Sequence, residues 1–242
     1  KMCQMRLSTM ATSLKSRTAD PSHASLSHEE FVGFIVDDEW LSRENKRLKT
    51  RLKHARFKIP AQPEQIDYQT KRGLNKSLML ELATLKWIVN SQNILLTGPT
   101  GVGKSFVAQA LGHQACLKGF SAHYIRLSKL LNELFVARAD GSYNRLLAKL
   151  YKLDVLIIDD WGLAPLKEQE AQDLLDVIEE RYEIKSTIVT SQIPIQNWHE
   201  FIGNPTLADA ILDRLVHNSY KIDLKGDSMR KQKEKDIAQG GR

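Results

Sequence analysis

The chain has 242 residues, 42% of them hydrophobic, which suffices for one large domain or for one domain with an appendage. No uninterrupted apolar stretch reaches the roughly 18 residues of a membrane-spanning helix, and the basic, serine-rich N-terminus lacks the apolar segment of a secretory signal. The chain has only two cysteines, Cys3 and Cys116, so no disulfide framework is expected. We therefore expect a reducing, cytoplasmic compartment. The sequence begins at Lys1 rather than Met, so we expect residues to precede it.

The excess of positive over negative charge lies in the first part of the chain. Residues 1–90 contain 16 Lys and Arg against 10 Asp and Glu, whereas residues 91–242 contain 19 of each. The formal net charge of +6 therefore lies entirely before residue 91. This distribution predicts a basic module attached to a neutral domain.

The basic module should be helical. After a weakly helical start over 5–14, Ser27 and Glu30 form a capping box, which predicts that a helix begins there. Apolar residues at helical spacing then accompany a run of cations, so we expect an amphipathic helix with a basic face over 43–58. The expected DNA-binding cations are Arg43, Lys46, Arg47, Lys49, Arg51, Lys53, Arg56 and Lys58, followed by Lys71 and Arg72.

Two interpretations of the basic helix are open, a solvated surface and a nucleic-acid contact. Residues 43–58 contain eight cations and one acid, Glu44, and phosphates would reduce the repulsion between these cations. Nucleic-acid contact is therefore favoured. The chain has no zinc-binding spacing and no homeodomain or RNA-binding signature, so contact with the phosphate backbone is expected rather than base reading.

Residues 98–105, GPTGVGKS, match the phosphate-loop pattern G-x-x-x-x-G-K-[ST]. An apolar strand over 94–96 precedes the loop and a helical pattern over 106–117 follows it, which is the context of a nucleotide site. Lys104 would reach the β- and γ-phosphates of ATP, and the Ser105 hydroxyl would ligate Mg²⁺. The expected ATP-binding residues here are Gly98, Pro99, Thr100, Gly101, Val102, Gly103, Lys104, Ser105 and Phe106.

Two later strands end in polar residues. The apolar run over 155–158 ends in Asp159 and Asp160, so we expect Asp159 to hold the Mg²⁺ shell and Asp160 to orient the attacking water. The strand over 186–192 ends near Thr190 and Ser191, and such residues point into the nucleotide cleft of a parallel sheet. Alternation of strands and helices through the remaining chain predicts an α/β fold with helices on both faces.

Taken in order, these motifs resemble those of AAA+ ATPases of the DnaC/IstB clade, above all the IstB family of transposition helpers. The similarity covers nearly the whole chain and is carried by GPTGVGKS, VLIIDDWG, TIVTSQ, ILDRLVHNSY and SMR. It implies a P-loop core with a five-stranded parallel sheet over 69–230, a helical DNA-binding module over 1–68 and a charged tail over 231–242. No separate C-terminal lid domain is expected.

The resemblance also implies roles for single residues. Ser191 or Thr190 occupies the position that senses the nucleotide, and Arg230 matches a second sensor. Arg214 matches the arginine finger that reaches the γ-phosphate of a neighbouring subunit, although the sequence alone favours a surface salt bridge there. Asp160 stands where many AAA+ proteins have Glu, which suggests modest hydrolysis.

The function implied by the resemblance is an ATPase that oligomerises on double-stranded DNA, selects a target and recruits or activates a transposase. A DnaC-like loader of a replicative helicase would share the ATP chemistry but bind single strands. A small-molecule phosphotransferase would need an acceptor pocket and an arginine-rich lid, and neither is visible. An ATP switch that scaffolds DNA without hydrolysis is the remaining alternative.

Overall fold

The computed structural model describes residues 1–23, 25–68 and 72–229, and its contacts divide the chain into two units. The first unit is Lys1–Arg51, and the second begins at Leu52. This boundary lies before the expected one at residue 68. The reason is that the intervening segment packs into the second unit, where Ala61 and Ile66 are buried. There, the Lys58 N–H also donates to Gln109 Oε1 at 2.6 Å.

The N-terminal unit contains helix α1 (Ser8–Ala19), a short 3-10 helix η1 (Pro21–His23) and most of helix α2 (His28–Ala55). The predicted capping box is confirmed, because the Glu30 N–H donates to Ser27 Oγ at 3.2 Å and the Ser27 N–H donates to Glu30 Oε2 at 2.9 Å. Where two helical patterns were expected, α2 is continuous. Polar contacts join it to α1, including Arg17 Nη2 to Asp38 Oδ2 at 3.0 Å.

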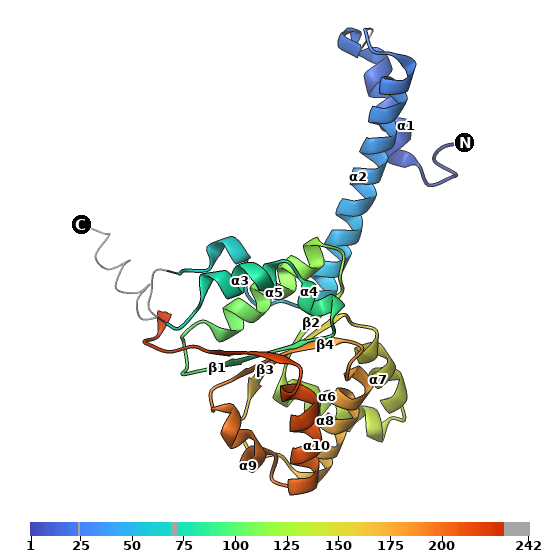
Figure 1. Cartoon of the computed structure of the whole chain (residues 1–242). Helices are drawn as coiled ribbons and strands as arrows, with labels where there is room; N and C mark the ends of the chain where they lie inside the picture. Colours follow the sequence, from blue (N-terminus) through green and yellow to red (C-terminus); the bar gives the residue numbers. More distant parts are fainter. Residues whose placement is uncertain (24, 69–71, 230–242) are drawn as a thin grey trace, which may run out of the picture. The chain divides into compact units, whose positions relative to one another are not determined.

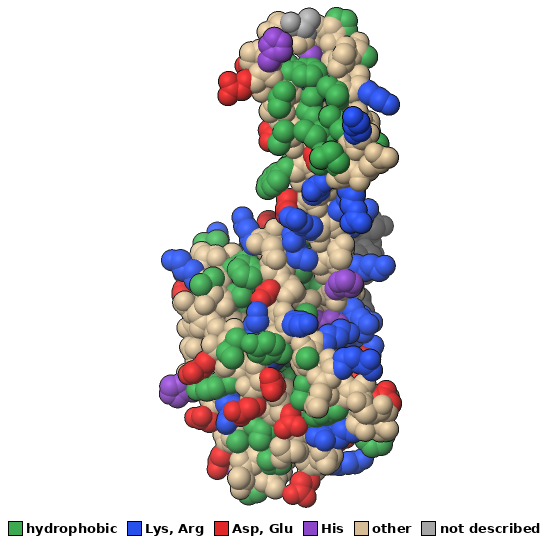
Figure 2. Space-filling view, turned by 90° about the vertical axis from the view of Figure 1, so that its right-hand side faces the viewer, with side chains coloured by type: hydrophobic (Ala, Val, Ile, Leu, Met, Phe, Trp, Pro, Cys, Tyr) green, Lys and Arg blue, Asp and Glu red, His purple; other side chains and the backbone are tan. Residues whose placement is uncertain are grey.

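Several large apolar side chains of α2 are exposed. Ile35 is buried, but Val32, Val36 and Trp40, spaced four residues apart, are 54%, 47% and 59% exposed. Figure 2 shows hydrophobic side chains gathered on the face of this unit that it draws. The N-terminal unit therefore has an open apolar face.

The second unit is built on a five-stranded parallel sheet (Figure 1). The strand order is β2-β3-β4-β1-β5, so the fold class expected from the motifs is confirmed. Since all strands run the same way, their carboxyl ends meet at one edge of the sheet. The strands are β1 (Asn93–Thr97), β2 (Ala122–Arg126), β3 (Val155–Trp161), β4 (Ser186–Ser191) and β5 (Ser219–Asp223).

Helices cover both faces of this sheet (Figure 1). Ile157 of β3 meets Gly112 of α5 on one face, while Leu156 and Ile158 join the core formed with the helices of the other face. This alternation explains why β3 is apolar from Val155 to Ile158. One face carries α3 (Lys76–Ala83), α4 (Lys86–Val89) and α5 (Lys104–Leu117), and the other carries α6 (Leu127–Ala139), α7 (Tyr143–Tyr151), α8 (Glu168–Arg181), α9 (Trp198–Ile202) and α10 (Pro205–Val216).

Local backbone geometry and capping set two of the helix boundaries. Helices α3 and α4 are separate because Leu85, between them, has a left-handed backbone with φ of 63°. Helix α10 begins at Pro205, because the Asn204 side chain caps it by accepting from the Leu207 N–H at 3.2 Å. None of the described helices has the length and apolar character needed to cross a membrane.

Candidate nucleotide-binding site

The phosphate loop joins β1 to α5 and is shaped by three glycines. Gly98, Gly101 and Gly103 have φ values of 134°, 86° and 101°, which residues other than glycine rarely adopt. A Cβ at Gly98 would also lie 2.0 Å from the Leu224 carbonyl oxygen. The loop ends at the N-terminus of α5, whose free N–H groups and helix dipole favour an anion. These features fit the phosphates of a nucleotide.

Lys104 lies at the base of the loop and is 8% exposed. Its Nζ donates to the carbonyl oxygens of Gly98 at 2.6 Å and Pro99 at 2.7 Å. Burial lowers the pKa of the Lys104 ammonium, and the nearby Asp159 and Asp160 carboxylates only partly offset that effect. A phosphate group beside the ammonium would compensate for its lost hydration.

Asp159 is the centre of a buried hydrogen-bond network. Its Oδ1 accepts from Ser105 Oγ at 2.8 Å and from the Thr190 hydroxyl, and its Oδ2 accepts from the Tyr124 hydroxyl at 2.5 Å. Burial and the hydrogen bond to Asp159 raise the pKa of Tyr124, so the phenol stays a donor. Hydroxyls from α5, β4 and β2 thus hold the carboxylate beside Ser105. This pair of oxygen ligands suits Mg²⁺ bound together with nucleotide phosphates.

Asp160 is oriented differently from Asp159. Its φ of 63° lies in the left-handed region, and the pairing of β3 with β4 shifts register between Ile158 and Trp161. The Asp160 Oδ2 lies 3.3 Å from Arg126 Nε, at the end of β2. Backbone strain of this kind is concentrated at functional positions. The shift lets two consecutive residues present their carboxylates in different directions.

The structure distinguishes the two hydroxyls expected to sense the nucleotide. Thr190 reaches Asp159, whereas the fully buried Ser191 donates to the Trp161 carbonyl oxygen at 2.9 Å and accepts from the Ile193 N–H at 3.2 Å. Of the two hydroxyls, only that of Thr190 contacts the Asp159 carboxylate, whereas that of Ser191 is engaged in the turn after β4.

Arg214 does not approach the phosphate loop of its own chain. Its backbone carbonyl accepts from Asn93 Nδ2 at 3.2 Å, which puts α10 beside the first residue of β1, whereas the loop follows the last. The guanidinium forms an ion pair with Glu179 of α8. The alternative considered from the sequence, a salt bridge, is the contact observed within the chain. A finger role requires a second subunit.

The cations expected to bind DNA fall into different environments. Lys46, Lys49 and Lys53 of α2 are exposed, and no ion pair joins them to any described residue. Arg43 and Arg47 are paired with acids of their own helix, at 2.8 Å from Glu39 Oε1 and 2.6 Å from Glu44 Oε1 respectively. Arg51, Arg56 and Lys58 complete the expected set; Arg56 and Lys58 are exposed and Arg51 is half-buried. Figure 2 shows Lys and Arg side chains gathered on the face that it draws.

The expectation that Arg72 binds DNA is corrected by its position. Arg72 is 4% exposed, and its Nη1 donates to the Val102 carbonyl oxygen inside the phosphate loop at 3.0 Å. A buried side chain cannot lie along a duplex. Lys71 and Arg230, expected in DNA and nucleotide binding respectively, lie outside the described residues.

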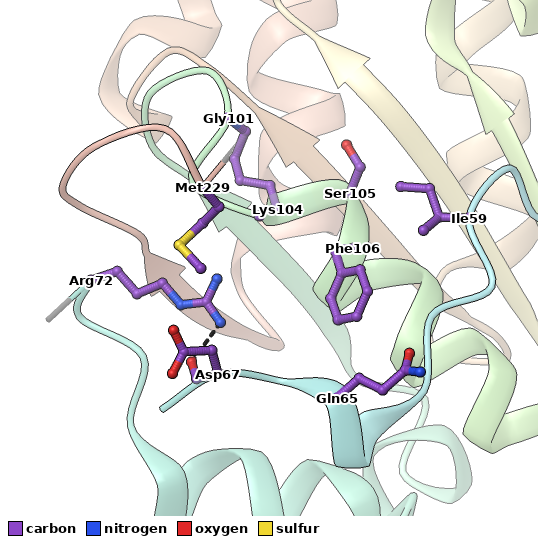
Figure 3. Close-up of a pocket in the computed structure, with 10 residues that line it drawn as sticks. Ile59, Gln65, Asp67, Arg72, Gly101, Lys104, Ser105, Phe106 and Met229 are labelled. Atoms are coloured by element: carbon purple, nitrogen blue, oxygen red, sulfur yellow. Dashed lines mark hydrogen bonds between the residues drawn. The ribbon is translucent and has the colours of Figure 1, made fainter. Parts of the chain in front are cut away.

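A cavity of about 300 Å³ opens beside the loop (Figure 3). It suits a nucleoside because apolar and polar side chains meet there. The Met229 N–H donates to the Gly101 carbonyl oxygen at 3.0 Å, so the segment after β5 forms part of the wall. Besides the loop residues Gly101, Gly103, Lys104, Ser105 and Phe106, the cavity is lined by Ile59, Gln65, Asp67, Arg72 and Met229.

Sequence reasoning missed several residues of this site. Nothing in the local sequence marks Ile59 or Gln65, and Met229 lies in the SMR motif but was not assigned to the site; only the fold brings these three residues to the cavity. Tyr124 and Arg126 could have been found, because β2 neighbours β3 and its last residues must lie near Asp159 and Asp160.

A phosphate loop after β1, a carboxylate pair at the end of β3 and the strand order β2-β3-β4-β1-β5 define an ATP-binding protein of the AAA+ type. Solved structures share this fold. DnaA bound to AMPPCP and single-stranded DNA gives a TM-score of 0.58 at 18% identity, covering 76% of this chain and 57% of that one. DnaI gives a TM-score of 0.57 at 20% identity, covering 68% of this chain and 91% of that one.

The chain belongs to the family of IstB-like ATP binding proteins, whose model matches residues 1–237. It is 46% identical over 231 residues to "Putative insertion sequence ATP-binding protein y4pL" of Sinorhizobium fredii, covering 96% of this chain and 94% of the relative. It is 47% identical over 192 residues to the "Insertion sequence IS1162 putative ATP-binding protein" of Pseudomonas fluorescens, covering 79% and 83%.

Proposed function

We propose that this chain is a cytoplasmic, DNA-dependent ATPase that assembles on duplex DNA and assists the transposition of an insertion sequence. It would select the target DNA and recruit or activate the transposase. The observation that carries the proposal is the family match, which covers both the basic N-terminal unit and the ATP-binding unit. Relatives named as insertion sequence proteins cover nearly the same length.

The proposed ATP chemistry uses groups that are close together at the carboxyl edge of the sheet. Ser105 and Asp159 would hold Mg²⁺, which neutralises phosphate charge when bound. Lys104 would exchange its two carbonyl partners for phosphate oxygens, and Asp160 would orient the attacking water. The Asp160–Arg126 contact is solvent-accessible, since Arg126 is 62% exposed, and can open without unfolding.

The proposed DNA contact uses the exposed lysines of α2. Lys46, Lys49 and Lys53 follow the i, i+3, i+7 spacing, so they share one face of the helix. With no described acid paired to them, they are available to phosphates. Lysines of this kind contribute affinity without sequence preference.

Electron microscopy tests the proposed assembly. With ATP and duplex DNA we expect ordered rings or helical filaments, and with ATP and single-stranded DNA of equal length we expect none. The Lys104→Ala variant should form none on either DNA. Assembly on single strands only, together with binding to a replicative helicase, would replace this proposal by the helicase-loader function, which at present rests on fold likeness alone.

Composite active sites predict a specific result for Asp160 and Arg214. Asp160→Asn and Arg214→Ala should each bind ATP but lower phosphate release at least about tenfold, since one loses the water-orienting charge and the other a charge at the γ-phosphate. Mixing the two variants should partly restore turnover, because some interfaces then combine an intact Asp160 with an intact Arg214. Phosphate release is measured over a range of mixing ratios.

The ion pair of Arg214 supplies a matched control for this experiment. Glu179→Gln breaks the same salt bridge but keeps the arginine. If Arg214 acts on a neighbouring nucleotide, Glu179→Gln should retain nearly full turnover. Equal losses in Glu179→Gln and Arg214→Ala, with no rescue on mixing, would show that Arg214 only stabilises the contact between α8 and α10.

A further inference from the structure

We propose that Arg72 is a nucleotide-binding residue whose guanidinium contacts the α-phosphate of ATP. The proposal rests on ATP binding at the phosphate loop and concerns a side chain that no loop motif contains. It differs from the sequence-based expectation, in which Arg72 belonged to the basic residues that contact DNA.

The guanidinium of Arg72 is packed directly against the phosphate loop. Its Nη1 donates to the Val102 carbonyl oxygen at 3.0 Å, and its Nη2 donates to the Asp67 carbonyl oxygen at 2.7 Å. A Cβ placed on Gly103 would lie 2.6 Å from Nη1, which shows how closely the guanidinium approaches the backbone of the loop. Figure 3 shows the Arg72 side chain among the residues that line the cavity.

One hydrogen-bond donor of this buried side chain has no partner among the described residues. The Nε of Arg72 is inaccessible to solvent, and no described residue accepts a hydrogen bond from it. An unmade hydrogen bond of a buried charged group is costly, and such groups in native proteins usually have a partner. Arg72 lines the cavity, so an oxygen of a nucleotide bound there would lie next to its guanidinium.

Arg181 shows how this chain satisfies a buried arginine that has a structural role. Arg181 is 1% exposed, and all three of its nitrogens donate. Nε donates to Thr187 Oγ1 at 3.2 Å, and Nη2 donates to the Ser186 carbonyl oxygen at 2.5 Å. Nη1 donates to the Leu150 carbonyl oxygen at 2.6 Å. A buried arginine with a structural role therefore need not leave a hydrogen-bond donor without a partner. The Nε of Arg72, which has none among the described residues, indicates a ligand.

The position of Arg72 indicates which part of the nucleotide its guanidinium contacts. Lys104 and the glycines of the loop surround the site of the β- and γ-phosphates, whereas Ile59, Phe106 and Met229 offer apolar contact to a base. The α-phosphate joins these two parts. Burial lowers the pKa of the Arg72 guanidinium, and an anion at the α-position would offset that loss of hydration.

The backbone of Arg72 is anchored to the far end of the same unit. Its carbonyl oxygen accepts from the Lys225 N–H at 2.8 Å, just after β5. The anchor holds Arg72 between the loop and the segment that carries Met229. The guanidinium is therefore held in place before the nucleotide arrives, and less entropy is lost when the contact forms.

Competition binding tests the proposal. The affinities of ATP, ADP and AMP are measured by displacement of a fluorescent ADP analogue from wild type and from Arg72→Gln. We expect all three affinities to fall by a similar factor, about ten- to a hundredfold, because all three ligands contain the α-phosphate and lose a hydrogen bond to a charged group. The matched control is Arg181→Lys, which should lower the unfolding temperature but leave each affinity within about twofold.

Two outcomes would overturn the proposal. Wild-type affinities in a folded Arg72→Gln variant would show that Arg72 only stabilises the loop. A loss of affinity confined to ATP would assign the Arg72 contact to the γ-phosphate. If Arg72→Gln does not fold, NMR of the wild type decides. On addition of ADP the Nε–H resonance of Arg72 should shift, and an unchanged resonance would refute the contact.

Discussion

Replacement of Lys104 by alanine should abolish ATP binding, with at least about a hundredfold loss of affinity for a fluorescent ATP analogue. The ammonium is buried at the base of the loop, 2.6 Å and 2.7 Å from two carbonyl oxygens. It can reach two phosphates from that position, and alanine leaves their charge uncompensated in a poorly solvated site. The apo protein should stay folded, because the two carbonyls can bind water instead.

The control for this variant is Lys118→Ala. Lys118 follows the same helix, α5, but is exposed at its C-terminal end, remote from the loop. Its replacement should change the affinity less than about twofold. If Lys104→Ala binds the analogue as wild type does while its circular dichroism is unchanged, the nucleotide does not occupy this loop.

Replacement of Lys46, Lys49 and Lys53 by alanine should weaken DNA binding and reduce its dependence on salt. Each lysine that neutralises one duplex phosphate contributes about −0.9 to the slope of log affinity against log salt, so the slope should flatten by roughly two to three units. The loss should be similar for unrelated duplex sequences, because backbone contacts carry no sequence information. Fluorescence anisotropy with labelled duplexes over a salt series measures both quantities.

A second triple variant controls for the loss of three positive charges. Lys86, Lys118 and Lys152 are exposed lysines of the ATP-binding unit. Their joint replacement changes the net charge by the same amount, so it reports the effect of overall charge alone. If both triple variants weaken DNA binding equally, or if neither changes the salt slope, α2 presents a solvated face and the DNA site lies elsewhere in the chain.

Exposure and ion pairing determined the choice of these lysines. Arg47 lies on the same helix but is paired with Glu44 at 2.6 Å, so part of its charge is already compensated. The Arg47→Ala change would remove that pair along with any phosphate contact, and the two effects would be mixed. The unpaired lysines avoid this ambiguity, which the sequence alone would not reveal.

The sequence by itself determined the features that depend on residues close together in the chain. The capping box at Ser27 and Glu30 and the phosphate loop over 98–105 each span at most eight residues, and their geometry follows from local backbone preferences. The alternation of apolar strands with helical patterns also predicted a parallel sheet covered on both faces, because buried strands of such sheets are apolar on both faces, and the family resemblance implied that it has five strands.

Only the tertiary structure decided which groups the side chains from distant segments contact. Arg72 is thirty residues from Val102, and a sequence pattern cannot tell a cation directed to solvent from one directed to the phosphate loop. Thr190 and Ser191 are adjacent and chemically similar, but successive strand residues point to opposite faces, so one reaches Asp159 and the other the Trp161 carbonyl. Burial, register and hydrogen-bond competition settle such choices, and all three arise only when the chain is folded.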